Sequence, residues 1–189
     1  MTDILGLLKI TVRRGIHLAV RDAIRSASDP YVVITIGQQK LKTHVVKRNC
    51  NPTWNEVLVF PITDPNVPIN LAVFDKDTFS RDDQMGVVVI DIKPFIAALK
   101  MVKSLHNLPS SCALKRIQCN RSNCLAEESS VVWENGRVTQ DMRIKLQDVE
   151  CGEILLQLNW TEVPGSKGLE SEAMAGPWTP RPLHTKKQH

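Results

Sequence analysis

The 189-residue chain has no uninterrupted apolar segment long enough to cross a bilayer. Hydrophobic residues make up 42% of it, yet no window approaches the roughly 18 consecutive apolar residues that a spanning helix requires. Its start, MTDILGLLKI, lacks the basic region and the cleavage site of a secretory signal. Internal repeats are also missing. These absences predict one soluble domain that stays inside the cell.

The cysteines lack the spacing of a zinc or redox motif. They are odd in number, and none belongs to a CxxC pair. The five are Cys50, Cys112, Cys119, Cys124 and Cys151. We therefore interpret them as reduced thiols that behave as small, partly buried hydrophobic residues.

Acidic residues are missing between Asp29 and Glu56. In the segment KLKTHVV, the alternation of a strand sends Lys40, Lys42 and His44 to one face. Two readings of the lysines stay open, an attraction to acidic lipid headgroups and an ordinary solvated strand face. The net charge of +4 is mild, and we expect no nucleic-acid partner.

Short segments rich in Val, Ile and Thr fill the first half of the chain. The loops between them have the spacing of an all-β sandwich. The segments are GLLKITVRR, YVVITIG, KLKTHVVK, EVLVFPI, INLAVF and MGVVVIDI. Two closing strands are predicted near MRIKL and CGEILLQLNW. We therefore expect eight strands in the core of the domain, within residues 1–91 and 142–163.

An insertion is predicted at residues 92–141. Its first part has apolar residues on one helical arc, which predicts a short amphipathic helix packed on the sandwich. The arc consists of Phe95, Ala98, Leu99, Val102 and Leu105. Residues 107–126 carry few periodic signals, and we assign no element to them. Asn135-Gly136, between two strand-like runs, predicts a tight hairpin.

The end of the chain, residues 164–189, has little periodicity and several prolines. This composition predicts a disordered tail. The single domain is therefore expected to end at residue 163.

Aspartates crowd the segment VFDKDTFSRDDQMG, which follows the apolar run INLAVF. Asp75, Asp77, Asp82 and Asp83 fall within nine positions. Such carboxylates repel one another and raise each other's pKa unless a cation or water relieves them. The segment is therefore either a solvated acidic loop or part of a metal site.

A second acidic segment, RDAIRSASDPY, has Asp22 and Asp29 at the two ends of a predicted loop. If both loops lie at one end of a sandwich, five carboxylates converge there. Hard oxygen ligands in that number suit Ca²⁺, which takes about six to eight, better than Mg²⁺. The pair of loops thus predicts a calcium site more strongly than either loop alone.

Two other aspartate-based sites fit the segment less well. An EF-hand is excluded because Ser80 stands where its loop needs Gly, and Gly86 stands where it needs Glu. A phosphotransferase or metal-dependent phosphatase could use the DxD pair at Asp75 and Asp77. That chemistry usually needs a parallel α/β sheet, and the sequence does not alternate strands with helices.

Three strings, SDPYV, NPTWNE and VFDKD…DDQMG, resemble the C2 domain in their order and spacing. The resemblance implies an eight-stranded antiparallel C2 β-sandwich that binds Ca²⁺ through the two acidic loops. Its carboxylate ligands would be Asp22, Asp29, Asp75, Asp77 and Asp83, with backbone carbonyls from Arg21 and Lys76. Asp82 falls one place off the ligand position and is interpreted as a neighbour.

Residues 4–169 further resemble the plant C2-domain abscisic-acid-related family, on strings such as RGIHLAVRD, KPFIAALKM and NCLAEESSVVW. The resemblance implies a non-enzymatic, calcium-dependent phospholipid-binding adaptor that brings PYR/PYL-type abscisic acid receptors to the plasma membrane. It also implies an alternative, activation of a YchF-type GTPase. Two departures are a first loop about one residue longer than expected and a tail without a counterpart in the family.

The loops also carry two apolar residues where solvent exposure is expected. Ile24 in the first loop and Phe79 in the second either dip into lipid headgroups or fold back onto their own loops. Trp54 precedes the apolar run VLVF and is expected in the core. We therefore expect a protein of the cytoplasm that binds the plasma membrane peripherally. Its basic end is compatible with a nuclear pool.

Overall fold

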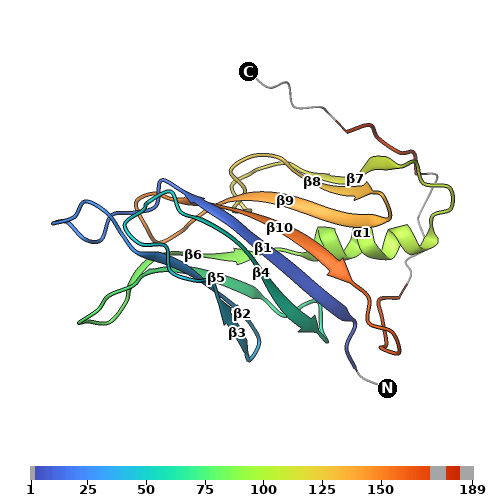
Figure 1. The fold of residues 1–189 in the computed structure, drawn as a ribbon. Helices are drawn as coiled ribbons and strands as arrows, with labels where there is room; N and C mark the ends of the chain where they lie inside the picture. Colours follow the sequence, from blue (N-terminus) through green and yellow to red (C-terminus); the bar gives the residue numbers. More distant parts are fainter. Residues whose placement is uncertain (1–2, 171–177, 184–189) are drawn as a thin grey trace.

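The structure, a computed structural model, describes residues 3–170 and 178–183. Two antiparallel sheets pack face to face and one helix covers part of the larger sheet (Figure 1). The six-stranded sheet has the order β4-β1-β10-β9-β8-β7, and the four-stranded sheet has the order β3-β2-β5-β6. The strands and the helix are β1 Gly6–Ile16, β2 Pro30–Ile36, β3 Gln39–Lys42, β4 Thr53–Ile62, β5 Ile69–Asp75, β6 Asp83–Ile90, α1 Lys93–Ser104, β7 Ser111–Ile117, β8 Ser129–Glu134, β9 Arg137–Lys145 and β10 Glu153–Thr161.

The core lies between the sheets because the inner faces of their strands are apolar. In β1, buried and partly exposed residues alternate, and Leu8, Ile10 and Val12 are fully buried. Trp54 of β4 is buried as expected, and its indole N–H donates to the carbonyl of Pro30 at 3.3 Å. The all-β antiparallel sandwich predicted from the sequence is thus confirmed.

Helix α1 covers the part of the larger sheet that the smaller sheet leaves open. It packs against β7, β8 and β9 with the apolar arc predicted from the sequence, of which Phe95, Ala98 and Leu99 are buried. Pro94 stands in its first turn, where a missing N–H costs nothing. Within the described residues, no helix is long and apolar enough to span a membrane.

Strand β7 lies among the residues to which the sequence assigned no element. Its backbone shifts register between Ala113 and Lys115, and the consecutive residues Cys112, Ala113 and Leu114 are all buried. A bulge of this kind interrupts the alternation by which strands are recognised in a sequence. The structure therefore adds a strand to the predicted insertion.

Strand β9 joins two elements that the sequence analysis separated. The second arm of the predicted hairpin and the closing strand near MRIKL form one strand, Arg137–Lys145. The expected boundary between residues 141 and 142 falls inside it. The tight turn before it is present as predicted, with positive φ angles of 48° at Asn135 and 82° at Gly136.

The described parts of residues 164–189 contact the domain instead of forming the disordered tail expected from composition. Leu169 is buried, and its carbonyl accepts a hydrogen bond from Lys103 Nζ of α1 at 2.8 Å. Farther along, Arg181 pairs with Ala113 of β7. The proline-rich composition gives no sign of these contacts, because each contact depends on the position of a single residue. The rest of the predicted tail, 171–177 and 184–189, lies outside the described residues.

Candidate metal centre

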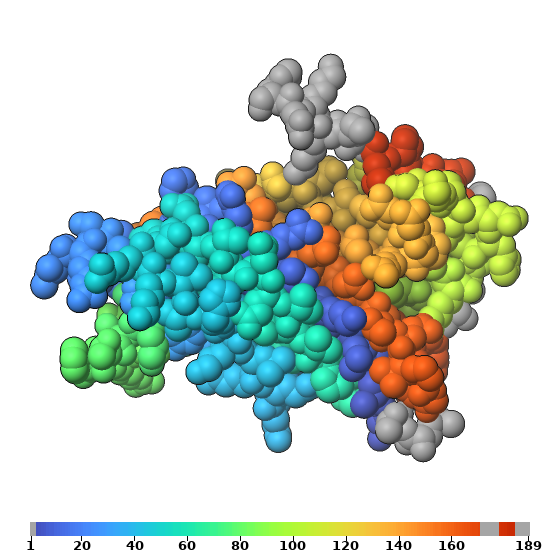
Figure 2. All heavy atoms as spheres, in the orientation of Figure 1, coloured from blue at the N-terminus to red at the C-terminus, as the bar shows by residue number. Residues whose placement is uncertain are grey.

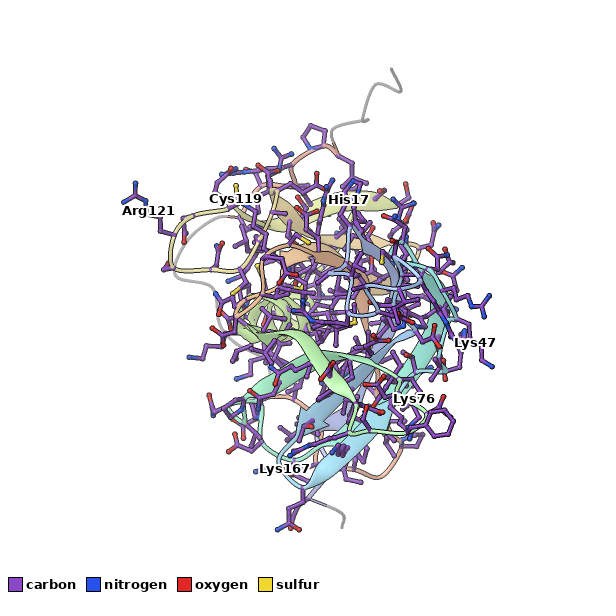
Figure 3. The ribbon with its side chains drawn as sticks, turned by 90° about the vertical axis from the view of Figure 1, so that its left-hand side faces the viewer. His17, Lys47, Lys76, Cys119, Arg121 and Lys167 are labelled. Carbon is purple, nitrogen blue, oxygen red and sulfur yellow. The ribbon has the colours of Figure 1, made fainter. Side chains whose placement is uncertain are left out.

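The register of the smaller sheet brings both acidic loops to one end of the sandwich. Pro30 at the start of β2 pairs with Asp75 at the end of β5, and Asp75 also pairs with Asp83 at the start of β6. The loops flank these positions, and they project side by side at the left of Figure 1. Figure 3 looks onto this end, with Lys76 of the second loop labelled. The sequence prediction that the two loops meet is therefore confirmed.

Asp75 is a buried carboxylate at the base of the second loop, with 5% of its surface exposed. Burial raises its pKa, and the nearby charges of Asp77, Asp29 and Asp83 raise it further. A hydrogen bond from the backbone N–H of Asp29 to Asp75 Oδ1, 2.6 Å long, opposes the increase. A buried carboxylate with carboxylate neighbours is a place where a cation would be stabilised.

The first loop, between β1 and β2, is closed by its own backbone and by Asp22. The backbones of Asp22 and Ala27 pair with each other, and Ser26 takes a positive φ of 49°. Asp22 Oδ1 accepts the N–H groups of Ile24 and Arg25, both at 3.1 Å. Arg25 Nε lies 3.5 Å from Asp22 Oδ2. The first loop thus forms a tight turn around Asp22.

A cleft of about 260 Å³ separates the two loops. Four of the five predicted carboxylate ligands line it, namely Asp22, Asp29, Asp75 and Asp77. Arg25, Arg48 and Lys76 line it as well. In Figure 2 the loops form two separate protrusions, blue and green, with a hollow between them. Asp83 stands beside Asp75 on the neighbouring strand but does not line this cleft.

The aspartates suit calcium by their chemistry but are not assembled around a metal position. Within residues 3–170 and 178–183, no three His, Cys, Asp or Glu side chains are close enough to hold a metal ion. Asp22 is turned toward its own loop, and Asp29 Oδ1 accepts the N–H of Arg48 at 2.8 Å. The carboxylates therefore share one cleft, and their side chains would have to turn to share one ion.

Asp82 supports the second loop. It accepts a hydrogen bond from the Tyr31 hydroxyl at 2.5 Å, another from Lys76 Nζ at 3.3 Å, and a third from the N–H of Asp77 at 3.0 Å. The Tyr31 bond is the largest cause of the lowered pKa of Asp82. Burial, followed by the same bond, raises the pKa of Tyr31 to about 12. Asp82 thus holds Tyr31, Lys76 and Asp77 together, a structural role that the sequence did not show.

The two apolar residues in the loops face solvent. Ile24 is 97% exposed and Phe79 is 100% exposed. The alternative that they fold back onto their own loops is therefore excluded for this structure. They are the two most exposed of the large hydrophobic side chains in the described part of the chain.

Lys40 and Lys42 lie on the outer face of the smaller sheet. Both are exposed, and they pair across the strands with Thr35 and Val33. Lys42 Nζ lies 5.9 Å from the centre of the Tyr31 ring. Tyr31 in turn stacks on Phe74, with ring centres 5.7 Å apart. The sequence analysis missed these two rings, although Tyr31 is the only tyrosine of the chain.

A family model of the C2 domain matches residues 6–108. The Arabidopsis thaliana protein C2-domain ABA-related 10 is 54% identical over 172 residues, which cover 91% of this chain and 94% of that protein. The chain belongs to the C2-domain ABA-related family. Another relative, GTPase activating protein 1 of Oryza sativa subsp. indica, is 50% identical over 166 residues, which cover 88% of this chain and 98% of that protein.

Solved C2 domains share the fold of this family member. A C2 domain of plant extended synaptotagmin 1 matches with a TM-score of 0.53 and 22% identity, over 85% of this chain and 97% of that one. The calcium-bound pair of C2 domains of extended synaptotagmin 2 matches with a TM-score of 0.55 and 22% identity, over 84% of this chain and 46% of that one. At such identities the likeness concerns the fold alone.

Replacing Tyr31 by Phe should reduce the stability of this C2 domain in a pH-dependent way. The change removes a hydrogen bond to an ionised carboxylate, and we expect a loss of about 1.5 kcal/mol at neutral pH. Because folding lowers the pKa of Asp82, this contribution is present above its ordinary value of 3.8 and is lost as the pH falls through the lower folded value. Urea unfolding at about pH 7 and about pH 3 measures both effects. A loss that is equal at both pH values would contradict this role, and Asp82→Asn serves as the uncharged control.

Proposed function

We propose that this C2-domain ABA-related protein is a calcium-dependent phospholipid-binding adaptor without enzymatic activity of its own. One observation carries the proposal. Four carboxylates from two loops line a single cleft, and that cleft lies between two fully exposed apolar residues, Ile24 and Phe79. The likeness in fold to the calcium-bound C2 domains of extended synaptotagmin 2 and the match to the C2 family model support it.

The candidate ligands all belong to the two loops. They are the carboxylates of Asp22, Asp29, Asp75, Asp77 and Asp83 and the backbone carbonyls of Arg21 and Lys76. Bound Ca²⁺ would neutralise these carboxylates and offer open coordination positions to the phosphate oxygens of lipids. To take part, Asp22 has to release the N–H groups of Ile24 and Arg25. The loops are therefore expected to change shape between the two states.

Other residues would contact the bilayer directly. Ile24 and Phe79 would enter the headgroup region, where burying each side chain contributes about 1.5–3 kcal/mol. Lys40 and Lys42 would add an attraction to acidic headgroups of about 1 kcal/mol each near the surface. These lysines lie on the sheet that carries both loops, so one orientation on a membrane would use both groups.

With the loops at the bilayer, the opposite end of the domain would face the cytoplasm. The Asn135–Gly136 turn of the insertion lies at that end, because β9 runs from this turn toward the loops. We infer that this part of the insertion brings PYR/PYL-type abscisic acid receptors to the plasma membrane, with further pools in the cytoplasm and the nucleus. The names of the relatives, which contain ABA-related, support a place in abscisic acid signalling.

Vesicle sedimentation with and without Ca²⁺ tests the calcium requirement. We expect wild-type protein to sediment with phosphatidylserine vesicles only in the presence of Ca²⁺, and to bring a PYR/PYL-type receptor with it. Asp75→Asn combined with Asp77→Asn should reduce sedimentation at least about tenfold, because two of the cleft carboxylates are lost. Asp3→Asn combined with Asp64→Asn removes the same number of charges from exposed positions outside the loops and is the matched control. Equal sedimentation of all three proteins with and without Ca²⁺ would refute the proposal.

Replacing Ile24 and Phe79 by Ala should weaken vesicle binding without changing calcium binding in solution. The substitutions remove apolar surface but no ligand, so we expect at least about a tenfold loss of vesicle affinity. Calcium titration by calorimetry, without vesicles, should match wild type. Val57→Ala is the control because Val57 is another exposed apolar residue, 50% exposed on β4. An undiminished affinity of the double variant would mean that the loop tips do not enter the bilayer.

A second candidate is the activation of a YchF-type GTPase. The name of the rice relative, GTPase activating protein 1, favours it. Activators of this kind supply an exposed arginine to the nucleotide of the partner. Arg121 and Arg137 are exposed, and Arg121 extends away from the body in Figure 3. Arg116 is a weaker candidate because its guanidinium is hydrogen-bonded to the carbonyl of Pro182 at 2.9 Å.

Single-turnover GTP hydrolysis by a YchF-type protein tests this second candidate. Addition of wild-type protein should accelerate hydrolysis by about 10³-fold or more if an arginine is supplied. Arg121→Ala or Arg137→Ala should then abolish the acceleration, whereas Arg81→Ala, an exposed arginine of the acidic loop, should not. An unchanged rate with wild-type protein would remove this candidate and leave the lipid-binding function untouched.

A further inference from the structure

Strand β7 is the edge of the six-stranded sheet. A strand edge carries backbone groups that can pair with another chain, and proteins usually cover or block such an edge. Here a distant segment of the same chain, residues 178–183, lies along the edge (red in Figure 1). The N–H of Ala113 donates to the carbonyl of Arg181 at 3.0 Å. The edge thus already pairs with an extended peptide, supplied by the chain itself.

The segment is held by few contacts. Besides the Ala113 bond, the Arg116 guanidinium donates to the carbonyl of Pro182 at 2.9 Å. Trp178 is half-buried and packs against the core, while residues 179–183 are exposed. A hollow of about 290 Å³ remains between the segment and β7. The segment is therefore anchored at its tryptophan and joined to the strand at one main-chain position.

The prolines give the segment a particular role at the edge. Pro180 and Pro182 flank Arg181, the residue that pairs with β7. In an extended chain, neighbouring residues direct their backbone groups to opposite sides. Because proline has no N–H, these outward positions offer no donor to a further strand. The segment therefore covers the edge of β7, while its own outer side offers no N–H at Pro180 or Pro182 with which a further strand could pair.

We propose that the edge of β7 is a docking site for an extended peptide segment of a partner protein, and that residues 178–183 occupy it until such a segment displaces them. The partner peptide would carry an aromatic residue for the Trp178 position and an extended backbone that adds a strand to the sheet. Binding of this kind derives affinity from main-chain hydrogen bonds and selectivity from the side-chain anchor. A partner that pairs with more of Ser111–Ile117 than Ala113 alone forms more bonds than the chain's own segment does.

Tethering explains why so few contacts suffice for the chain's own segment. A covalently attached segment has an effective concentration in the millimolar range, so weak contacts keep it in place. Because these contacts are weak, a peptide that forms more hydrogen bonds with β7 can replace the chain's own segment. The edge is separate from the calcium loops, because Ser111 of β7 pairs with Glu134, beside the turn at the opposite end of the domain. The two surfaces can thus be occupied at the same time.

Hydrogen exchange of the full-length protein tests whether the segment covers β7. The Ala113 amide should be protected in wild type and should exchange at least about tenfold faster in Trp178→Ala, which removes the anchor. Arg116→Ala, which removes the bond to Pro182 and keeps the tryptophan, should act in the same direction. Thr179→Ala is the matched control, because Thr179 lies in the segment and is exposed. Equal exchange in all four proteins would overturn the proposal.

Peptide binding tests the site itself. A peptide with the sequence of residues 178–183, WTPRPL, titrated to millimolar concentration, should shift the β7 amide resonances of ¹⁵N-labelled full-length Trp178→Ala in nuclear magnetic resonance spectra, because that concentration matches the one that tethering supplies. The peptide should bind wild type at least about tenfold more weakly, because the site there is occupied. The peptide ATPRPL should bind neither protein. Absence of binding to Trp178→Ala, with an unchanged far-UV circular dichroism spectrum, would overturn the proposal. So would dimers of wild type in sedimentation velocity that are lost in Trp178→Ala, since the edge would then belong to a second copy.

Discussion

The pairing of β2, β5 and β6 at one end of the smaller sheet is the constraint on which the candidate site depends. Pro30, Asp75 and Asp83 are held side by side by this register, and a shift of one residue would turn their side chains to the other face. The buried Asp75 is thereby fixed at the base of the cleft, with the N–H of Asp29 as its hydrogen-bond donor. Both loop tips lie beyond this paired region.

The insertion follows from a second constraint, the unequal width of the two sheets. The four-stranded sheet cannot cover all strands of the six-stranded sheet. The inner face of β7, β8 and β9 therefore needs another apolar layer. Helix α1 provides this layer, with Phe95 fully buried. The insertion thereby becomes part of the same core as the sandwich. It also moves the edge of the sheet from β9 to β7, far from the loops. The proposed lipid-binding loops and the proposed docking edge therefore belong to different parts of the domain.

Sequence patterns predicted those elements that carry a short-range signal. The strands of the first half are rich in Val, Ile and Thr, the helix has an apolar arc, and the hairpin has the Asn135–Gly136 pair. β7, with the sequence SCALKRI, has a single β-branched residue, Ile117, and a register shift after Ala113 that interrupts its alternation. The sequence also gives no signal for contacts that depend on the direction of one side chain. The convergence of the loops followed from topology, whereas the hydrogen bonds that turn Asp22 toward its own loop are local and have no sequence pattern.

The net charge of the cleft is less negative than its number of aspartates alone suggests. Four carboxylates line it, but so do Arg25, Arg48 and Lys76, and Arg25 lies directly against Asp22. Without a metal these cations offset much of the mutual repulsion that the sequence predicts. A divalent cation entering the cleft has to compete with Arg25 for Asp22, so part of its Coulomb energy is used to displace a charge already present. Under the proposed function, the calcium concentration needed for lipid binding is therefore expected to depend on the cationic residues of the cleft as well as on its aspartates.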